Sequence, residues 1–399
     1  MFEGTRSILL AARREKISIL LSTTILILKV HIVSLDIPYP PDYGGMIDVF
    51  YKLKSLHQLG VEITLHCFQY GQRQPSQELN RLCKNVYYYK RKTGVRGLHF
   101  SLPYIISSRN NQALLKNLVM DDSPILFDGL HTCFFFNHPL LRNRVKLLRA
   151  HNIESEYYRQ LAQNTSSFFK KLYYYLESNR LLRYENSLKE LDAILAISEA
   201  DANYFSTTYP SIPVSYVPAF HAHDSVTSKA GKGTYCLYHG NLSVAENIKS
   251  VQYLVKEIFS DLPVPLIIAG KNPSVEMLAA ATDTIKIVPN PTESEMYTLI
   301  QQAQVLVLPS FQNTGMKLKL IDSLFAGRFV LLNESNRELG SVNGLSIATN
   351  TTTFKETVLL LMNMDFSMDA VTERTERLQP YMNAKGAQLI THFLTKYVG

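Results

Sequence analysis

The chain has 399 residues, a hydrophobic content of 46% and many aromatic side chains (19 Phe and 23 Tyr), which excludes a largely disordered protein and predicts two packed domains. Its formal net charge of +7 predicts an anionic partner, but nucleic acid, acidic lipids and phosphorylated substrates all satisfy that requirement. The four cysteines lack C-x-x-C and zinc-ligand spacing, so we expect reduced, buried thiols.

Residues 1–24 precede the first strand of the expected core. The apolar run from Ile17 to Leu28 has the length of a signal-peptide core, but Lys29 follows it without a small-residue cleavage pattern. The run is also too short to span a bilayer. We therefore expect an N-terminal extension, with a cleaved signal or an anchor as the alternative.

Residues 25–205 alternate short apolar runs with helix-like segments. Such alternation predicts a parallel sheet with helices on both faces, a doubly wound α/β domain. The expected strands are 25–35, 61–68, 124–130, 145–151 and 193–198, and the expected helices are 45–60, 111–119 and 166–191.

Residues 206–233 are rich in Pro, Ser, Thr and Gly and lack a helical period, which predicts a linker. The alternation then restarts and predicts a second doubly wound domain over 234–375. We expect a final helix within 376–399 to pack back on the first domain. Open α/β sheets bind ligands at the carboxyl ends of their strands, so the loops after the strands are the candidate sites.

The loop after the first strand reads DIPYPPDYGGMIDVF. Gly44 and Gly45 remove side chains where a helix begins, as the close approach of a phosphate or a sugar requires, although a plain tight turn is the alternative. No G-x-G-x-x-G follows this strand, which argues against an NAD or FAD enzyme.

Loops of the second domain carry further candidates. Lys317 and Lys319 lie in the first turn of the helix within 311–328, where side chains lean back toward the N-terminus. With the free amides of that turn they would form a diphosphate site, and two solvated surface charges are the alternative. Asp322 could accept hydrogen bonds from a ribose. Other candidates that follow strands are Gly240, Asn241, Asn247, Lys271, Thr314 and Gly315.

These motifs together resemble the family-4 glycosyltransferases, retaining sugar-nucleotide enzymes of GT-B architecture. The resemblance spans nearly the whole chain from residue 28 and implies two facing Rossmann-like domains, with the nucleotide diphosphate on the second, the acceptor on the first and the active site in the cleft. It rests on the pair Gly44-Gly45, FDGLH ending at His131, RAHNIESEYY (149–158), AISEAD (196–201), YHGNLSVAEN (238–247) and PSFQNTGMKLKLIDSLFAG (309–327).

The resemblance also implies roles for single residues. Gly45 would approach the donor phosphate or sugar, His131 would contact the donor sugar at the reacting centre, and Gly315 and Met316 would offer backbone amides. Lys317 and Lys319 would neutralise the diphosphate, with Lys271 assisting, and Asp322 would hold the ribose. His151, Asn152 and Glu154 follow a strand and are the expected acceptor-side residues, with a plain helix-start residue as the alternative for Glu154.

The chain departs from the family pattern at several positions. Many members carry two glutamates eight positions apart where this chain has Thr314 and Asp322, and an arginine where it has Asn241. These departures leave the donor open and admit an inactive member. We expect no metal site, because the H-x-H at His221 and His223 lacks a third ligand, and no cofactor besides the nucleotide-sugar substrate.

The segment 168–183, FFKKLYYYLESNRLLR, is both basic and aromatic. We expect it to be the buried face of a helix with a solvated flank. Contact with an anionic membrane surface is the alternative.

The predicted function is metal-independent, retaining transfer of a sugar from a nucleotide-diphosphate sugar to a glycan or lipid-linked acceptor in cell-surface polysaccharide biosynthesis. The enzyme would be cytoplasmic, with peripheral contact to the inner face of the cell membrane. A sugar-nucleotide 2-epimerase and a non-catalytic GT-B protein that binds a sugar nucleotide or a partner remain alternatives. Nucleic-acid binding is not expected, because no basic helix or aromatic-platform module is evident.

Overall fold

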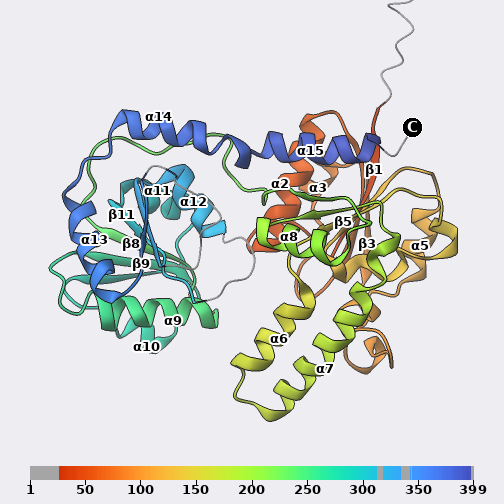
Figure 1. The fold of residues 1–399 in the computed structure, drawn as a ribbon, viewed down its shortest axis with the longest axis horizontal. Coiled ribbons are helices and arrows are strands. Elements are labelled where there is room, and N and C mark those ends of the chain that lie inside the picture. Colours follow the sequence, from red (N-terminus) through yellow and green to blue (C-terminus); the bar gives the residue numbers. More distant parts are fainter. Residues whose placement is uncertain (1–26, 312–317, 334–341, 343, 397–399) are drawn as a thin grey trace, which may run out of the picture.

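The computed structural model describes residues 27–311, 318–333, 342 and 344–396. They form two α/β domains, each with one parallel sheet between layers of helices (Figure 1). This confirms the predicted fold class. The N-terminal extension expected over 1–24 lies outside the described residues.

The first sheet has seven parallel strands in the order β3-β2-β1-β4-β5-β6-β7. Its central strands are mostly apolar, as is typical of strands that are covered on both faces. β7 lies inside the segment 206–233, so part of the expected linker is an edge strand of this sheet. The strands are β1 (Lys29–Ser34), β2 (Glu62–Gln69), β3 (Asn85–Lys90), β4 (Ile125–Asp128), β5 (Lys146–Ala150), β6 (Ala193–Ala196) and β7 (Val214–Tyr216).

Alternate residues of β1 feed two separate cores. Ile32 packs with Val49 of α2 on one face of the sheet, whereas Val33 packs with Leu114 of α5 on the other. The helices of this domain are α2 (Gly44–Gln58), α3 (Gln77–Leu82), α4 (Tyr104–Ser107), α5 (Gln112–Leu118), α6 (Glu154–Asn164), α7 (Phe168–Glu185) and α8 (Glu199–Thr208), with a 3-10 segment, η2 (Leu130–Phe135), after β4.

The second sheet has six parallel strands in the order β10-β9-β8-β11-β12-β13. The strand order reverses at β8 and β11, which makes this point the expected ligand site of a Rossmann-like sheet. The strands are β8 (Cys236–Asn241), β9 (Leu266–Lys271), β10 (Ile285–Pro289), β11 (Val305–Val307), β12 (Phe329–Asn333) and β13 (Leu345–Ala348). The helices are α9 (Ala245–Tyr253), α10 (Val275–Leu278), α11 (Glu293–Gln302), α12 (Leu318–Ala326), α13 (Thr351–Asn363) and α14 (Met368–Arg377), and a π-helical turn, η5 (Leu254–Ile258), extends α9.

The last helix, α15 (Asn383–Lys396), returns from the second domain to the first and lies on α2 (Figure 1). Ile390 and Leu394 join the buried cluster that contains Leu53 of α2. Gly386 permits the close approach, because a Cβ atom there would lie 2.9 Å from the ring of Phe220. The C-terminal helix therefore ties the two domains together.

Two further expectations can be compared with the structure. All four cysteines are buried and free, as predicted. The first half of α7, however, does not bury its aromatic residues: Phe168 and Phe169 are 73% and 82% exposed, and the expectation of a buried aromatic face is wrong there.

No helix in the described part of the chain has both the length and the apolar character to cross a bilayer.

Candidate active site

A cavity of about 300 Å³ lies between the two domains. The first domain contributes residues of α2 and of the loop before it, including Tyr51. The second domain contributes the C-terminal ends of β8 and β9 and the beginning of α11. The cavity therefore lies where the strand order of the second sheet predicts a ligand.

Four of the predicted donor-binding residues line this cavity, namely Gly240, Asn241, Lys271 and Asp322. Asn247 instead braces the lining loop, because its Nδ2 donates to the backbone oxygen of Asn241 at 2.8 Å. A Cβ atom at Gly240 would lie 3.2 Å from the same Nδ2, so this glycine lets Asn247 pack under the loop.

Lys319 is half-buried directly behind that loop. Its Nζ donates to Asn247 Oδ1 at 2.9 Å and to Tyr238 Oη at 3.2 Å, and it lies 4.9 Å from the centre of the Tyr238 ring. The ammonium group is thus held by the residues that shape the cavity rather than left to move in bulk water. The other residues predicted for this loop, Thr314, Gly315, Met316 and Lys317, lie outside the described residues.

Asp322, predicted to hold a ribose, contacts a histidine that the sequence analysis did not assign to the donor site. His223 Nε2 lies 2.9 Å from Asp322 Oδ1, and both residues line the cavity. The Asp322 side chain remains 35% exposed, so part of the carboxylate is still open to a ligand. His239 also lines the cavity, and burial lowers the pKa of its imidazole to about 4, so it is neutral at physiological pH.

At the start of α2, Gly44 faces the second domain, whereas a Cβ atom at Gly45 would meet Tyr43 of the preceding loop at 3.7 Å. A Cβ atom at Gly44 would lie 3.8 Å from Leu318 Cδ1, the first described residue of α12. The first turns of α2 and of α12 contain no acidic side chain. The N-terminal ends of two helices therefore approach one another from opposite sides of the cleft, and the free amides of helix N-termini favour an anion.

The predicted residues of the first domain form a separate group beside β4 and β5 that does not line the cavity. His131 Nδ1 lies 3.7 Å from Glu154 Oε1 and, although buried, it has no hydrogen-bond partner among the described residues. Burial and the charge of Arg109 keep the pKa of His131 well below its usual value, whereas burial and Glu185 raise the pKa of Glu154 to about 8. At neutral pH a neutral imidazole therefore faces a largely protonated carboxyl, to which Asn152 is hydrogen-bonded.

Replacing Glu154 with Gln should change how stability depends on pH. The raised pKa means that the folded chain keeps a proton there that the unfolded chain releases, so this stabilisation is full below the unfolded value and is lost as the pH rises to about 8. Relative to wild type, E154Q should gain on the order of 1 kcal/mol per pH unit between about pH 5 and about pH 8.

Chemical unfolding of both proteins across this range measures the effect. The exposed Glu356 of α13 provides a matched control, and E356Q should follow the wild-type profile. Parallel profiles for E154Q and wild type would contradict the raised pKa.

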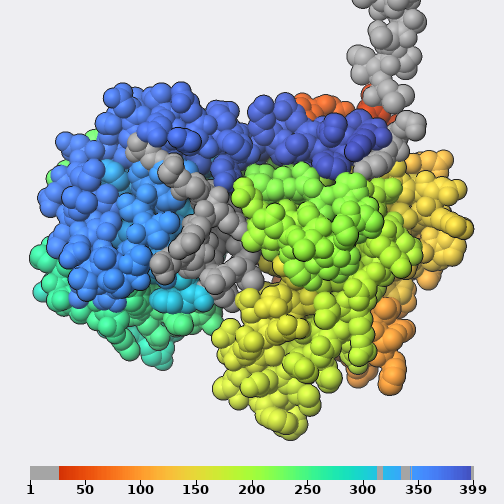
Figure 2. Space-filling model, viewed as in Figure 1, coloured from red at the N-terminus to blue at the C-terminus, as the bar shows by residue number. Residues whose placement is uncertain are grey.

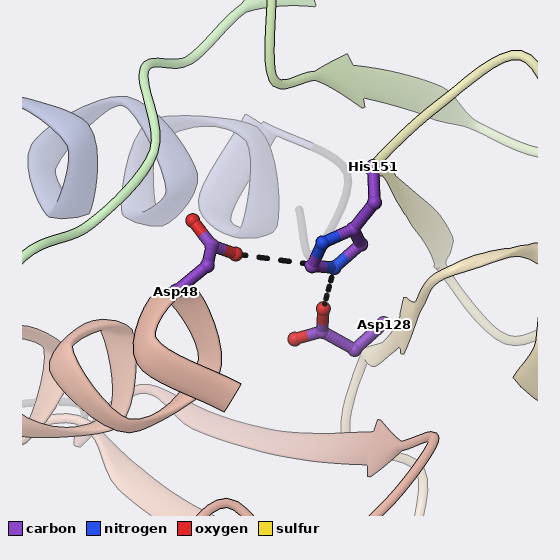
Figure 3. Close-up of side chains that lie close together, drawn as sticks. All are labelled: Asp48, Asp128 and His151. Atoms are coloured by element: carbon purple, nitrogen blue, oxygen red, sulfur yellow. Dashed lines mark hydrogen bonds and ion pairs between the residues drawn. The ribbon is translucent and has the colours of Figure 1, made fainter. Parts of the chain in front are cut away.

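A buried cluster of charged side chains lies beside His151 (Figure 3). Within the described residues, Asp48, Asp128 and His151 place one ligand atom each within 4.8 Å of one another, as a metal site would. His151 Nε2 lies 2.5 Å from Asp128 Oδ1 and 3.9 Å from Asp48 Oδ2 (Figure 3). Geometry alone would therefore admit a cation.

The charges of the neighbouring side chains argue against a metal. Lys52 Nζ lies 3.0 Å from Asp48 Oδ2 and 2.5 Å from Asp128 Oδ2, and Arg149 Nη2 donates to Asp48 Oδ1 at 2.8 Å. Burial alone would raise the pKa of the Asp48 carboxyl, but Arg149 and Lys52 reverse that effect and lower it. Two protein cations thus balance two carboxylates, and His151, predicted on the acceptor side, serves as a partner of this cluster.

The sequence analysis missed most of this cluster, although the sequence carried signals of it. Asp48 and Lys52 are four residues apart on one helix, and Arg149 interrupts an apolar strand. An arginine within the apolar run of a central strand is buried when the sheet forms, and a buried guanidinium needs an anionic partner.

Comparisons with known proteins agree with this architecture. Residues 233–364 match the family model of the glycosyl transferases group 1. An uncharacterised 44.6 kDa protein in the cps region of Klebsiella pneumoniae is 28% identical over 329 residues, which cover 76% of this chain and 82% of that protein.

Solved structures share the fold over nearly the whole chain. The match to a glycosyltransferase from Rickettsia africae includes 94% of this chain and 99% of that protein, with a TM-score of 0.62 and 11% sequence identity. The match to the pneumococcal O-GlcNAc transferase GtfA, solved with UDP and GlcNAc, includes 94% of this chain and 99% of that protein, with a TM-score of 0.63 and 10% sequence identity. The match to a UDP-forming α,α-trehalose-phosphate synthase from Burkholderia vietnamiensis includes 92% of this chain and 100% of that protein, with a TM-score of 0.61 and 10% sequence identity. At these identities the likeness establishes the fold alone.

Proposed function

We propose that this chain, whose residues 233–364 match the family model of the glycosyl transferases group 1 and whose fold is GT-B, transfers a sugar from a nucleotide-diphosphate sugar to a glycan or lipid-linked acceptor. One observation carries the proposal. The cavity between the domains is lined by Gly240 and Asn241 at the end of β8, Lys271 at the end of β9 and Asp322 of α12, at the carboxyl end of the sheet where Rossmann-like folds bind nucleotides.

In this proposal the positive groups of the cleft stabilise the departing diphosphate. Sugar transfer passes through an oxocarbenium-like state in which negative charge grows on the leaving group. Fixed cations and amides beside the phosphates stabilise that state more than the ground state. Lys271 at the cavity wall, Lys319 behind the β8 loop and the amides at the start of α2 would supply this charge, and Lys317 would join them. We further propose that no metal is required and that anomeric stereochemistry is retained.

The first domain would present the acceptor. His131 and Glu154 lie near one another, and both are largely neutral at neutral pH. His131, whose side chain is 21% exposed, would orient a hydroxyl group of a reacting sugar without placing a charge beside the anomeric carbon, with the buried Glu154 beside it. The Klebsiella relative is described by its position in a cps region, which supports a role in cell-surface polysaccharide biosynthesis, on the cytoplasmic side where sugar nucleotides are available.

A thermal-shift screen tests this proposal. We expect one of the UDP-, GDP-, ADP- or CMP-linked compounds to stabilise the protein, by roughly 2.7 kcal/mol at a hundred times its dissociation constant. Asp322→Ala should weaken the response to nucleotides, whereas D261A, which removes a carboxylate from the surface pair with Lys355, should not. No response to any nucleotide would contradict the proposal.

Product analysis separates the remaining alternatives. The departures from the family pattern at Thr314 and Asn241 favour the alternative of a non-catalytic protein. Such a protein would bind nucleotide diphosphate tightly but transfer sugar to no member of a broad acceptor panel. A 2-epimerase would convert the donor with no acceptor present. Transfer that requires both substrates would support the glycosyltransferase.

A further inference from the structure

Helices α6 and α7 form a hairpin that projects from the rest of the first domain (Figures 1 and 2). Its root is fixed by buried hydrogen bonds. Ser155 donates through its backbone N and its Oγ to the two carboxylate oxygens of Glu185 at 3.1 and 2.8 Å, and Ser178 Oγ donates to the backbone oxygen of Ser155 at 2.7 Å. These bonds join α6 to α7 at the base of the hairpin, and the tip extends away from the domain (Figure 1).

The distribution of side chains on α7 is inverted relative to a normal surface helix. Its buried residues are Glu177, Ser178, Leu181 and Glu185, three of which are polar. The first half of the helix instead exposes large apolar side chains, namely Phe168, Phe169, Leu172, Tyr173, Tyr175 and Leu176. Single exposed apolar residues are common on protein surfaces, but a contiguous group of this kind marks an interaction surface.

The charge of the same region has a single sign. Residues 157–176 contain no acidic side chain, but they include Arg159, Lys170 and Lys171. Arg159 and Lys171 also border an apolar groove of about 440 Å³ at the tip of the hairpin. Aromatic residues interleaved with lysines, without acids, are the composition that binds anionic lipid surfaces.

We propose that the tip of this hairpin, residues 162–176, docks on the surface of an anionic lipid bilayer. Phe168 and Phe169 would enter the boundary between headgroups and acyl chains, and Lys170 and Lys171 would contact lipid phosphates. Successive helical residues point about 100° apart, an angle that a single apolar helix face covers, so both phenylalanines can enter the same lipid surface.

The position of the hairpin fits an acceptor anchored in a membrane. α6 begins at Glu154, beside His131, and its 11 residues span about 16 Å. A docked tip would therefore hold the acceptor side of the cleft about one helix length from the lipid surface. The docking itself does not depend on the proposed function, since binding to vesicles is measured without donor, acceptor or turnover.

Co-sedimentation of the full-length chain with vesicles tests the proposal. Wild type should pellet with vesicles that contain phosphatidylglycerol and stay in solution with phosphatidylcholine alone, and added salt should weaken binding. F168S/F169S and K170E/K171E should each lower the partition coefficient about tenfold or more. Two matched pairs outside the first domain should bind as wild type does: L360S/M368S, at side chains that are 60% and 65% exposed, and K229E/K232E, at exposed lysines.

Three outcomes would overturn the proposal. The first is a wild-type chain that does not bind anionic vesicles. The second is hairpin variants that bind as wild type does, which would assign binding to another part of the chain, such as the basic residues 1–16 that every variant retains. The third is a wild-type dimer, seen by light scattering, that the hairpin substitutions dissociate without changing vesicle binding. Circular dichroism of each variant controls for folding.

Discussion

Replacing Lys319 with Ala should lower kcat by roughly 10²- to 10³-fold, the usual effect of removing one group that stabilises charge in a transition state. The ammonium group is already positioned by Asn247 and Tyr238, so it needs no reorganisation when charge grows on the leaving diphosphate. KM should change less, because the lysine stabilises the departing group more than the bound donor. Initial rates with saturating donor measure the effect.

Stability should change little in this variant. Lys319 is half-buried, and its hydrogen bonds to Asn247 and Tyr238 end on uncharged partners, so we expect a loss of about 1 kcal/mol. Lys355→Ala is the matched control, because it removes a lysine of the same domain from a surface ion pair with Asp261 at 2.7 Å. Activity of K319A within about twofold of this control would rule out the electrostatic role.

The alternation of apolar runs was sufficient to predict both sheets, because central parallel strands are buried on both faces and read as continuous apolar segments. The strands that escaped prediction are edge strands. β3 and β13 are only half-buried, and β7 has three residues inside a Pro- and Ser-rich segment. β7 and β13, with the sequences VSY and LSIA, contain no uninterrupted apolar run, and the run in β3 is mostly tyrosine, so the aliphatic pattern that identifies a central strand is missing.

Candidate site residues were predictable where they depend on strand order and not where they depend on tertiary pairing. The rule that ligands bind at the carboxyl ends of parallel strands placed Gly240, Asn241 and Lys271 at the cavity. The pairing of Asp48 with Arg149 joins residues 101 positions apart, and no local period can show that. For the same reason the sequence could not show that Lys319 is held by Asn247 of α9 and Tyr238 of β8.

Replacing Arg149 with Met should cause the largest loss of stability. Arg149 is fully buried and donates to Asp48 Oδ1 at 2.8 Å and to the backbone oxygens of Val217 and Pro218 at 2.5 and 2.9 Å. In the variant, two buried carboxylates would share the single cation of Lys52. Leaving a buried charge without its partner costs about 3–5 kcal/mol, and denaturant unfolding should show a loss of that size. Arg81→Met, at the exposed ion pair with Glu78, should cost less than about 1 kcal/mol.

A second substitution distinguishes an unpaired charge from a simple loss of packing. Asp48→Asn in the R149M background removes the uncompensated carboxylate while keeping its shape, so the double variant should be more stable than R149M alone. Lowering the pH should also reduce the stability loss of R149M. Without Arg149 the pKa of Asp48 rises, so the carboxylate is protonated as the pH falls and no longer carries an unpaired buried charge. If the double variant is no more stable than R149M, the loss comes from packing and the lost backbone hydrogen bonds, and the cluster does not act as a balanced set of charges.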